Sequence, residues 1–244
     1  MTAVVAQALR LFKRPQAVEW PLVALFLLMP FYLVIGWDYA PFQATHVPST
    51  FLDDWFPLAP AWSVVYGSLF LAALLPAFVL HEPLLFRRTI LAYLVAWLVA
   101  YAFFLAYPTL CPRPVRLEGD GFNVWLLRVI YGSDHRYNCF PSLHVAQCFI
   151  AAMACRVVHK PMGDVLLAWA ALVMVSTLYT KQHYAADAIA GAALAFAAAA
   201  WMLRGVQPES IPPTLQQLAP ALAIAAFGVY ASFVTILWFI YVFT

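Results

Sequence analysis

The chain contains seven apolar stretches, each close to the length that a helix needs to cross a lipid bilayer. They cover about 18–37, 61–80, 89–107, 141–158, 165–180, 184–203 and 218–243. A spanning helix needs about 20 apolar residues, so we expect several of these helices to tilt or to extend at their ends. Only 10% of the residues are charged, against about 25% in soluble domains. The sequence therefore predicts an all-α, polytopic membrane bundle that forms one domain over residues 1–244.

The segments between these stretches separate the basic residues into two sets on opposite sides of the membrane. One side holds Arg10, Lys13, Arg14, Arg87, Arg88, Arg156, Lys160 and Arg204. The other side holds Arg113, Arg116, Arg128, Arg136 and Lys181. The positive-inside rule places the larger set, and with it the N-terminus, in the cytoplasm. Residues 1–17 are expected to form an interfacial amphipathic segment. The net charge of +2 is too small to indicate a nucleic-acid partner.

A long loop, 108–140, joins the third and fourth stretches. Its Pro-rich start cannot be helical throughout. Residues 122–131 are apolar but too few to span, which predicts an interfacial helix that either covers a site as a lid or packs on neighbouring spans. Cys111 and Cys139 bracket the loop. Outside the cytoplasm they could form a disulfide, and two free thiols are the alternative.

The hinge between the fifth and sixth stretches carries an informative polar pair. His183 and Asp187 are four residues apart, so on a helix they lie on one face, one turn apart. A carboxylate in that position can hold the imidazole in one tautomer and keep its other nitrogen basic, as nucleophilic catalysis requires. The alternative is that Asp187 reaches the headgroups and that His183 is an ordinary interfacial residue.

The fourth stretch opens with a second polar group, which contains Ser142 and His144. The free N–H groups at the start of a helix form a ready site for phosphate. Counting the crossings places this group, Arg113 and the His183 hinge on the same side of the membrane. Two histidines, a carboxylate, cations and a helix N-terminus suit phosphoryl transfer without a metal. A metal site of His144, His183 and Asp187 is the alternative, but it leaves the cations unexplained.

Three segments together resemble the motifs of the type 2 phosphatidic acid phosphatase superfamily. They are Arg113-Pro114, the Pro-Ser-x-His sequence at 141–144, and Ser176, His183 and Asp187 with gaps of six and three residues. The resemblance covers about 107–191. It implies a core of six helices, so 218–243 would be an extra span. The Ser-Leu-His sequence at 142–144 is most similar to the branch that contains inositol phosphorylceramide synthases.

The resemblance also implies a role for each matched residue. His183 would be the nucleophile and form a phosphohistidine, while Asp187 would orient its ring. His144 would be the general acid for the leaving group and later the base for the acceptor. Arg113 and Ser142 would bind the phosphate. We expect this set of residues to work without a metal or other cofactor.

Two cations of the family pattern are missing from their usual positions. The Lys of the first motif falls at Ala106, and the Arg of the third motif falls at Thr177. We expect Lys181 to replace one of them, and Arg136 or Arg116 to replace the other.

The expected function is a metal-independent lipid phosphotransferase that moves a phosphoryl headgroup between a lipid and an alcohol. Its partners would be a phosphorylated lipid in the membrane and a polyol acceptor such as inositol, with the active site on the extracytoplasmic side. A lipid phosphate or pyrophosphate phosphatase with the same first half-reaction is the alternative. A non-catalytic lipid-binding or transport protein that uses the same cations for a headgroup is a second alternative.

Overall fold

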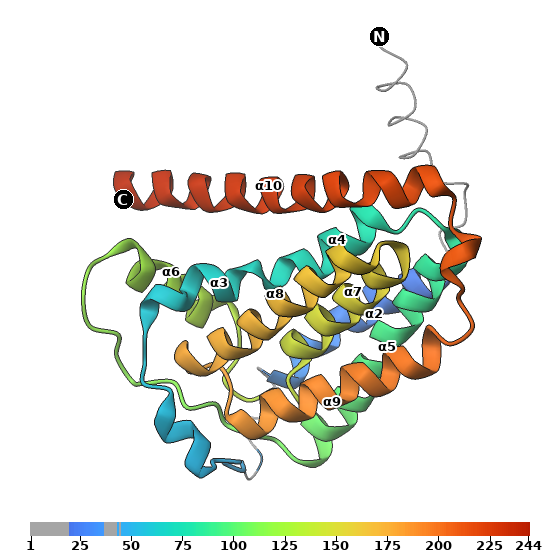
Figure 1. Ribbon diagram of the computed structural model, residues 1–244. Helices are drawn as coiled ribbons and strands as arrows, with labels where there is room; N and C mark the ends of the chain where they lie inside the picture. Colours follow the sequence, from blue (N-terminus) through green and yellow to red (C-terminus); the bar gives the residue numbers. More distant parts are fainter. Residues whose placement is uncertain (1–19, 37–42, 44) are drawn as a thin grey trace.

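The computed structural model describes residues 20–36, 43 and 45–244, and in these residues every regular element is a helix (Figure 1). The elements are α2 (Trp20–Val34), η3 (Phe51–Trp55), η4 (Pro60–Trp62), α3 (Ser63–Gly67), η5 (Ser68–Phe70), α4 (Leu71–Val79), α5 (Pro83–Ala106), α6 (Phe122–Ser133), α7 (Leu143–Val158), α8 (Lys160–Tyr179), α9 (Ala185–Met202), η6 (Pro208–Ser210) and α10 (Pro213–Phe243). The predicted all-α fold is confirmed. The predicted amphipathic segment 1–17 lies outside the described residues.

Five helical stretches are long and apolar enough to cross a membrane. They are Pro60–Val79, Pro83–Ala106, Lys160–Tyr179, Ala185–Met202 and Pro213–Phe243. The other two predicted spans correspond to α2 and α7, which are apolar but have only 15 and 16 residues. The chain is thus a multi-pass membrane protein, as predicted, with five spans of full length in its described part.

Several helices begin earlier than hydropathy predicts, because side chains cap their first turns. The Glu82 carboxylate accepts a hydrogen bond from Leu85 N, so α5 starts at Pro83 rather than at residue 89. His159 Nδ1 accepts one from Met162 N, so α8 starts at Lys160 rather than at residue 165. A capped first turn can contain charged residues that a search for apolar stretches excludes.

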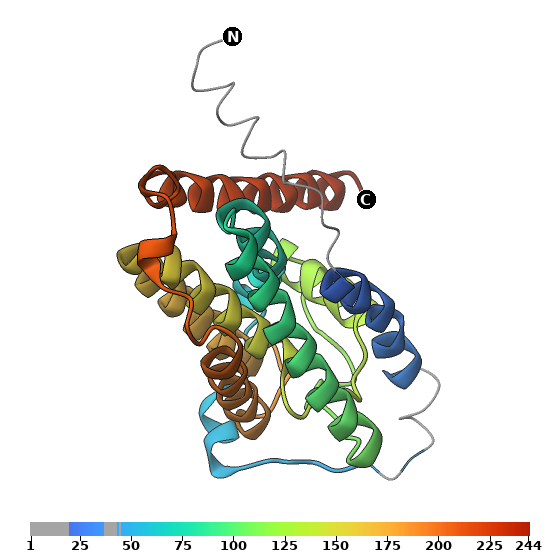
Figure 2. The same cartoon turned by 90° about the vertical axis from the view of Figure 1, so that its right-hand side faces the viewer.

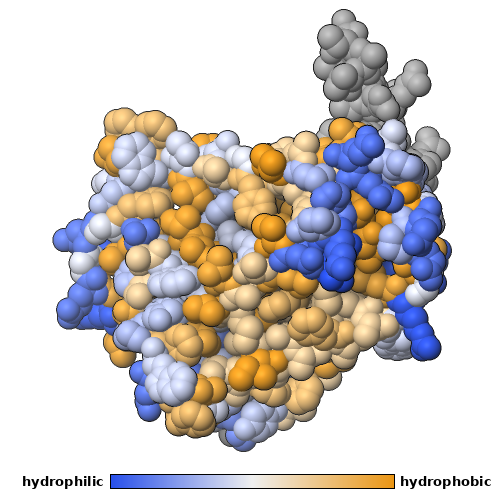
Figure 3. All heavy atoms as spheres, viewed as in Figure 1, coloured by the Kyte–Doolittle hydropathy of each residue, from blue (hydrophilic) through white to orange (hydrophobic). Residues whose placement is uncertain are grey.

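The short helix α7 is the centre of the bundle. It packs against α4, α5, α8 and α9, and small side chains such as Ala146, Ala151 and Ala152 are fully buried along it. In lipid the hydrophobic effect does not drive helices together, so they associate through close packing, which small residues allow. Figure 2 shows α5 between α2 and α9, in agreement with their contacts. Figure 3 shows mostly hydrophobic side chains between hydrophilic edges at the left and right of the molecule.

The loop before α7 and the turn before α9 lie at one end of the bundle, here called the site end (residues 107–121, 134–142 and 180–184). Isolated bridges join Thr109 to His46 and to Asn138, which ties the Pro-rich loop to its two neighbouring segments. A helix forms where the sequence predicts one, as α6. It packs against α3 and α10 and buries Leu126 and Leu127, so it is part of the bundle wall.

Candidate active site

A tight turn holds His183 between α8 and α9. Thr177 O accepts hydrogen bonds from Gln182 N and His183 N at 2.9 and 3.3 Å. Lys181 provides the left-handed residue of the turn, with φ of 53°. The side chain of His183 is 3% exposed. Thr177, where the family resemblance leads one to expect an Arg, therefore fixes the backbone of this turn.

Asp187 lies behind His183 and performs two tasks. Its Oδ2 accepts a hydrogen bond from Tyr184 N at 2.9 Å, which caps the first turn of α9. The same oxygen lies 3.5 Å from His183 Nδ1, in a fully buried ion-pair contact. The two residues are in contact as expected, but His183 lies in the turn before α9 rather than on one helical face with Asp187. A carboxylate on Nδ1 leaves Nε2 as the basic nitrogen of the ring.

The two histidines meet across the helix ends. His144 Nδ1 lies 3.3 Å from His183 Nε2, and the ring centroids are 5.6 Å apart. The ring of Tyr66 packs edge-on against His144. The expectation that both imidazoles lie on one side of the membrane is thereby confirmed, and Asp187, His183 and His144 form a continuous polar chain.

Ser142 joins α7 to α9 directly below the histidines. Its Oγ accepts a hydrogen bond from Val145 N at 3.3 Å, and its N donates to Asp187 O at 3.0 Å. A Cβ added at Gly191 of α9 would lie 2.3 Å from Ser142 O, so only glycine permits this approach. Ser142 is fully buried. Its oxygen serves as the α7 cap, and its hydroxyl proton remains for a ligand.

Arg113 is held beside the histidines by a dense set of acceptors. Its Nε and Nη2 donate to Gln182 Oε1. Nη1 donates to Asp134 O at 2.9 Å, and Nη2 lies 3.4 Å from the Asp134 carboxylate. Its guanidinium also lies over the Tyr131 ring. Burial disfavours the charged form, but Cys111 and Asp134 outweigh burial and raise the pKa of Arg113. Arg113 is therefore a fixed positive charge.

The two proposed replacement cations lie farther from the histidines. Arg136 is exposed, and together with Arg113 it lines a small pocket of about 290 Å³. Lys181 is half-buried. Among the described residues, neither makes a hydrogen bond or ion pair to His144 or His183.

Cys111 and Cys139 are both buried as free thiols, so the hypothesised disulfide is not formed. They remain close, because the Cys139 thiol hydrogen-bonds to Cys111. Burial opposes ionisation of Cys111, but this hydrogen bond and the Arg113 charge lower its pKa to about 7. Burial raises the pKa of Cys139 well above its ordinary value.

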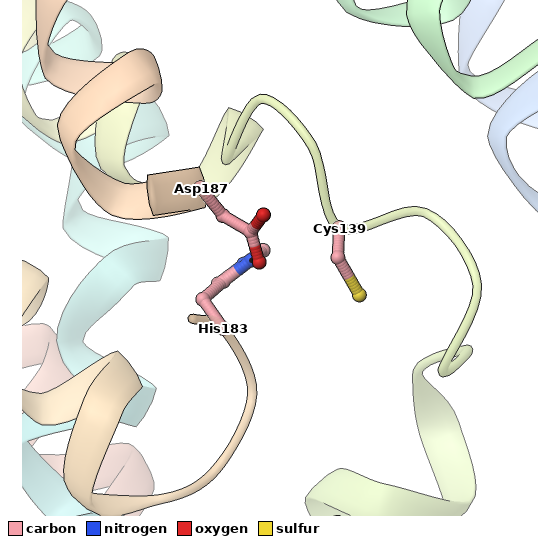
Figure 4. A group of neighbouring side chains, drawn as sticks. All are labelled: Cys139, His183 and Asp187. Carbon is pink, nitrogen blue, oxygen red and sulfur yellow. Dashed lines mark ion pairs between the residues drawn. The ribbon is translucent and has the colours of Figure 1, made fainter. Parts of the chain in front are cut away.

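Cys139, His183 and Asp187 converge from the loop before α7 and from the start of α9 (Figure 4). Their ligand atoms lie within 4.8 Å of one another. Thiolate, imidazole and carboxylate are zinc ligands, and this group differs from the set of His144, His183 and Asp187 considered from sequence. A metal would have to displace the proton of the buried Cys139 thiol, whose pKa burial raises. It would also compete with the hydrogen bond by which Asp187 caps α9.

Four contributors to the site were missed in the sequence. Gln182, Asp134 and Tyr131 position Arg113. Asp53 accepts a hydrogen bond from Ala185 N at 2.7 Å and helps to cap α9. Of these, only Gln182 gave a local signal, since it directly precedes His183. Its Nε2 is buried without a hydrogen-bond partner in the described part of the chain.

Comparison with known proteins gives one match. No curated protein and no solved structure matches the chain significantly. A sequence model of the PAP2 (type 2 phosphatidic acid phosphatase) superfamily matches residues 41–201. The match contains all three motifs and ends within α9, and it gives no evidence for the branch of inositol phosphorylceramide synthases. Since it spans more than half of the sequence, the chain belongs to the PAP2 superfamily.

Proposed function

We propose that this protein is a membrane enzyme that transfers the phosphoryl headgroup of a lipid to an alcohol acceptor through a phosphohistidine on His183. Membership of the PAP2 superfamily implies a phosphatase or phosphotransferase that acts on phosphate esters. Five apolar helices of spanning length place the protein in a membrane, which supports a lipid as the source of the ester.

The observation that carries the proposal is the short distance of 3.3 Å between His183 Nε2 and His144 Nδ1, with Asp187 behind His183. In the first step, His183 Nε2 attacks phosphorus while His144 donates a proton to the leaving lipid oxygen. The P–O bond breaks and an N–P bond forms. Because the two rings touch in the free protein, they must separate to admit the phosphoryl group.

In the second step, an acceptor hydroxyl gives its proton to His144 and attacks the phosphohistidine, which restores His183. An alcohol as acceptor makes the enzyme a transferase, and water makes it a phosphatase. The Ser-Leu-His sequence at 142–144 resembles that of inositol phosphorylceramide synthases, which favours a polyol such as inositol as the acceptor.

Fixed positive groups would hold the phosphoryl oxygens. Arg113 is buried and charged, and the unpaired Nε2 of Gln182 is the donor that a phosphate oxygen would satisfy. The Ser142 hydroxyl stands at the N-terminus of α7, where anions bind. Lys181 and Arg136 would attract the anionic headgroup from the surface. Preorganised donors of this kind stabilise charge that develops during phosphoryl transfer.

The test is an assay of the full-length protein in vesicles with a range of lipid phosphates, with and without inositol, and with products identified by mass. We expect phosphorylated inositol, together with the lipid alcohol that leaves in the first step. Inorganic phosphate and lipid alcohol without phosphorylated inositol would indicate the phosphatase instead. The absence of family cations at Ala106 and Thr177 favours a non-catalytic lipid-binding protein as the second candidate. If neither product formed while lipid binding was retained, the enzymatic proposal would be overturned in favour of the lipid-binding protein.

A further inference from the structure

We infer that α10, the helix beyond the family match, closes a membrane cavity that holds the hydrocarbon tail of the leaving lipid. The inference rests on the proposed function, because it assigns the tail of the same substrate. It adds a binding site and a set of residues that determine chain length.

The cavity has a volume of about 860 Å³ and is bordered by α2, α4, α5, α6, α7 and α10. A volume of this size lies in the upper part of the range for small-molecule pockets, about 300–1,000 Å³. It is larger than the pocket beside Arg113, which measures about 290 Å³. The cavity is thus large enough for a lipid tail.

Several contacts attach α10 to the bundle. Near its start, Ala219, Ala223 and Ala226 are buried and lie against the bundle, where α10 packs on α4. Near its end, Tyr241 packs on Phe122 and Trp125, close to the start of α6. The helix thus runs along the bundle from α4 to α6 (Figure 1), and in its middle part Phe227 packs on Trp169.

The part of α10 that follows provides bulky apolar side chains to the cavity. Phe233, Val234 and Leu237 line it, and Tyr230 anchors this part by donating its hydroxyl proton to Val64 O. Residues on the opposite face, such as Ile236, are exposed to the surrounding lipid. This part of α10 therefore forms one wall of the cavity, with Val234 and Leu237 half-buried toward it.

The cavity is polar at one end and apolar along its length. His144, Gln147 and Asp134 line it near the site end, whereas the wall farther in is formed by residues such as Leu22 and Phe86. On the α3–α4 stretch the lining runs from Tyr66 to Ala77, which is about 16 Å at about 1.5 Å per residue. Half of a hydrocarbon core of about 30 Å is about 15 Å. The cavity thus has the depth of one leaflet.

His144 connects the cavity to the proposed chemistry. One side of its ring meets His183 at 3.3 Å, and the residue also lines the cavity. In the proposed mechanism His144 protonates the leaving oxygen. The group attached to that oxygen therefore lies on the cavity side of His144, so the cavity receives the leaving lipid and not the transferred headgroup.

Photolabelling tests the inference without requiring turnover. The probe is hexadecyl phosphate with a diazirine at the far end of its chain, added to the full-length protein in phosphatidylcholine vesicles. We expect labels on cavity residues such as Ile90, which is buried, and Leu237, which is half-buried, and we expect excess hexadecyl phosphonate to remove them. Labels confined to outward residues such as Ile236, or labels that the phosphonate does not reduce, would overturn the inference.

A chain-length profile provides the second measurement. Val234→Trp and Leu237→Trp would fill the cavity, and Ile236→Trp is the matched control on the lipid-facing side. For hexadecyl phosphate we expect kcat/KM to fall about tenfold or more in the first two variants, the scale of steric discrimination in apolar pockets. For butyl phosphate all three should match the unmodified protein. An equal loss for both substrates, or no loss for either, would contradict a tail site.

The two measurements separate this inference from the proposed function. Protected labels in the cavity together with no phosphate release and no transfer would retain the tail site and refute the enzyme. Turnover with no chain-length dependence and with unprotected labels would retain the enzyme and refute the tail site.

Discussion

The histidine pair is the feature of single residues on which activity depends most directly. We predict that His183→Ala abolishes turnover, because no other group occupies the nucleophile's position next to Asp187. His144→Ala should lower kcat by roughly 10²- to 10⁴-fold, the contribution of a general acid. Asp187→Asn should cost a large factor but less than His183→Ala, since it leaves the nucleophile present in a poorer orientation.

Trapping of the ³²P-labelled intermediate under alkaline quench, together with steady-state rates, checks these three variants. Size-exclusion profiles in detergent serve as the control for folding. Robust turnover in folded His183→Ala and His144→Ala proteins would contradict the mechanism.

Gln182 is expected to act through Arg113. Gln182→Leu removes the acceptor of Arg113 Nε and Nη2, and hydrogen bonds to charged groups contribute about 1.5–3 kcal/mol. We therefore expect KM for a lipid phosphate to rise about tenfold or more, with a smaller change in kcat. Gln182→Glu is the matched variant. It keeps the acceptor but offsets the Arg113 charge, so binding should weaken although the protein packs normally. An unchanged KM in both variants would show that Arg113 does not need its hydrogen bonds to Gln182 to bind the substrate.

The group of Cys139, His183 and Asp187 makes a prediction about metals. Since the proposed phosphohistidine mechanism uses only protein side chains, we expect turnover to survive prolonged EDTA treatment. Added Zn²⁺ should inhibit, because capture of His183 by a metal removes the nucleophile. Cys139→Ser should weaken that inhibition and leave turnover nearly intact. If EDTA abolished activity and zinc restored it, the site would be a metal centre.

Contacts between residues that are close in the sequence could be predicted, but contacts that depend on the tertiary fold could not. His183 and Asp187 are four positions apart and are in contact at 3.5 Å, although His183 precedes the first residue of α9. Gln182 and Arg113 are 69 positions apart, and Arg113 and Asp134 are 21 apart. No periodicity relates such partners, so their pairing depends on how the loop folds back on α9.

At the scale of helices, the close contact between α9 and the start of α7 positions the site. We predict that Gly191→Ala displaces Ser142 and with it His144, because the new Cβ would lie 2.3 Å from a backbone oxygen. Overpacking of this kind costs about 1–3 kcal/mol. Both thermal stability in detergent and kcat should fall.

Gly228→Ala is the matched control for this variant. It lies in α10, where an added Cβ meets nothing within 4 Å. It should be neutral or slightly stabilising, because alanine is the better helix former. Equal behaviour of the two variants would show that the approach of α7 and α9 tolerates a methyl group.

Helix interiors could be predicted from the sequence more reliably than helix ends. The apolar cores of α5, α8 and α9 lie where hydropathy places them. The starts of α5 and α8 depend on the side-chain caps Glu82 and His159, and such residues are polar, so an apolar search ends before them. Helix α6 was predictable, and packing on neighbouring spans was one of its two expected roles, but its partners α3 and α10 were not predictable.

In the whole molecule, the sequence determines which loops share an end of the bundle, because each crossing reverses the chain. This parity correctly brought Arg113, His144 and His183 together. Parity says nothing about lateral order, so the position of α10 beside α4 and α6, and the cavity that it closes, could not be predicted. Lateral order depends on small interface residues such as Ala219 and Ala223, whose partners lie on other helices.

The same parity leads to a prediction about orientation. The positive-inside rule uses all eight cations of the larger set, and three of these, Arg10, Lys13 and Arg14, precede the described residues. We therefore predict that the site end faces the extracytoplasmic side. Val115, 98% exposed at the site end, and Glu209, exposed at the opposite end in η6, are suitable reporter positions.

In intact cells, a membrane-impermeant maleimide should label Val115→Cys without permeabilisation and should label Glu209→Cys only after it. The four native cysteines are buried, with at most 2% exposure, so they give little background. The reverse pattern would place His144 and His183 at the cytoplasmic leaflet. The proposed chemistry of the two histidines would remain possible, but its lipid and acceptor would then come from the cytoplasmic side. Thus the charge of three residues near the N-terminus decides which leaflet supplies the substrate.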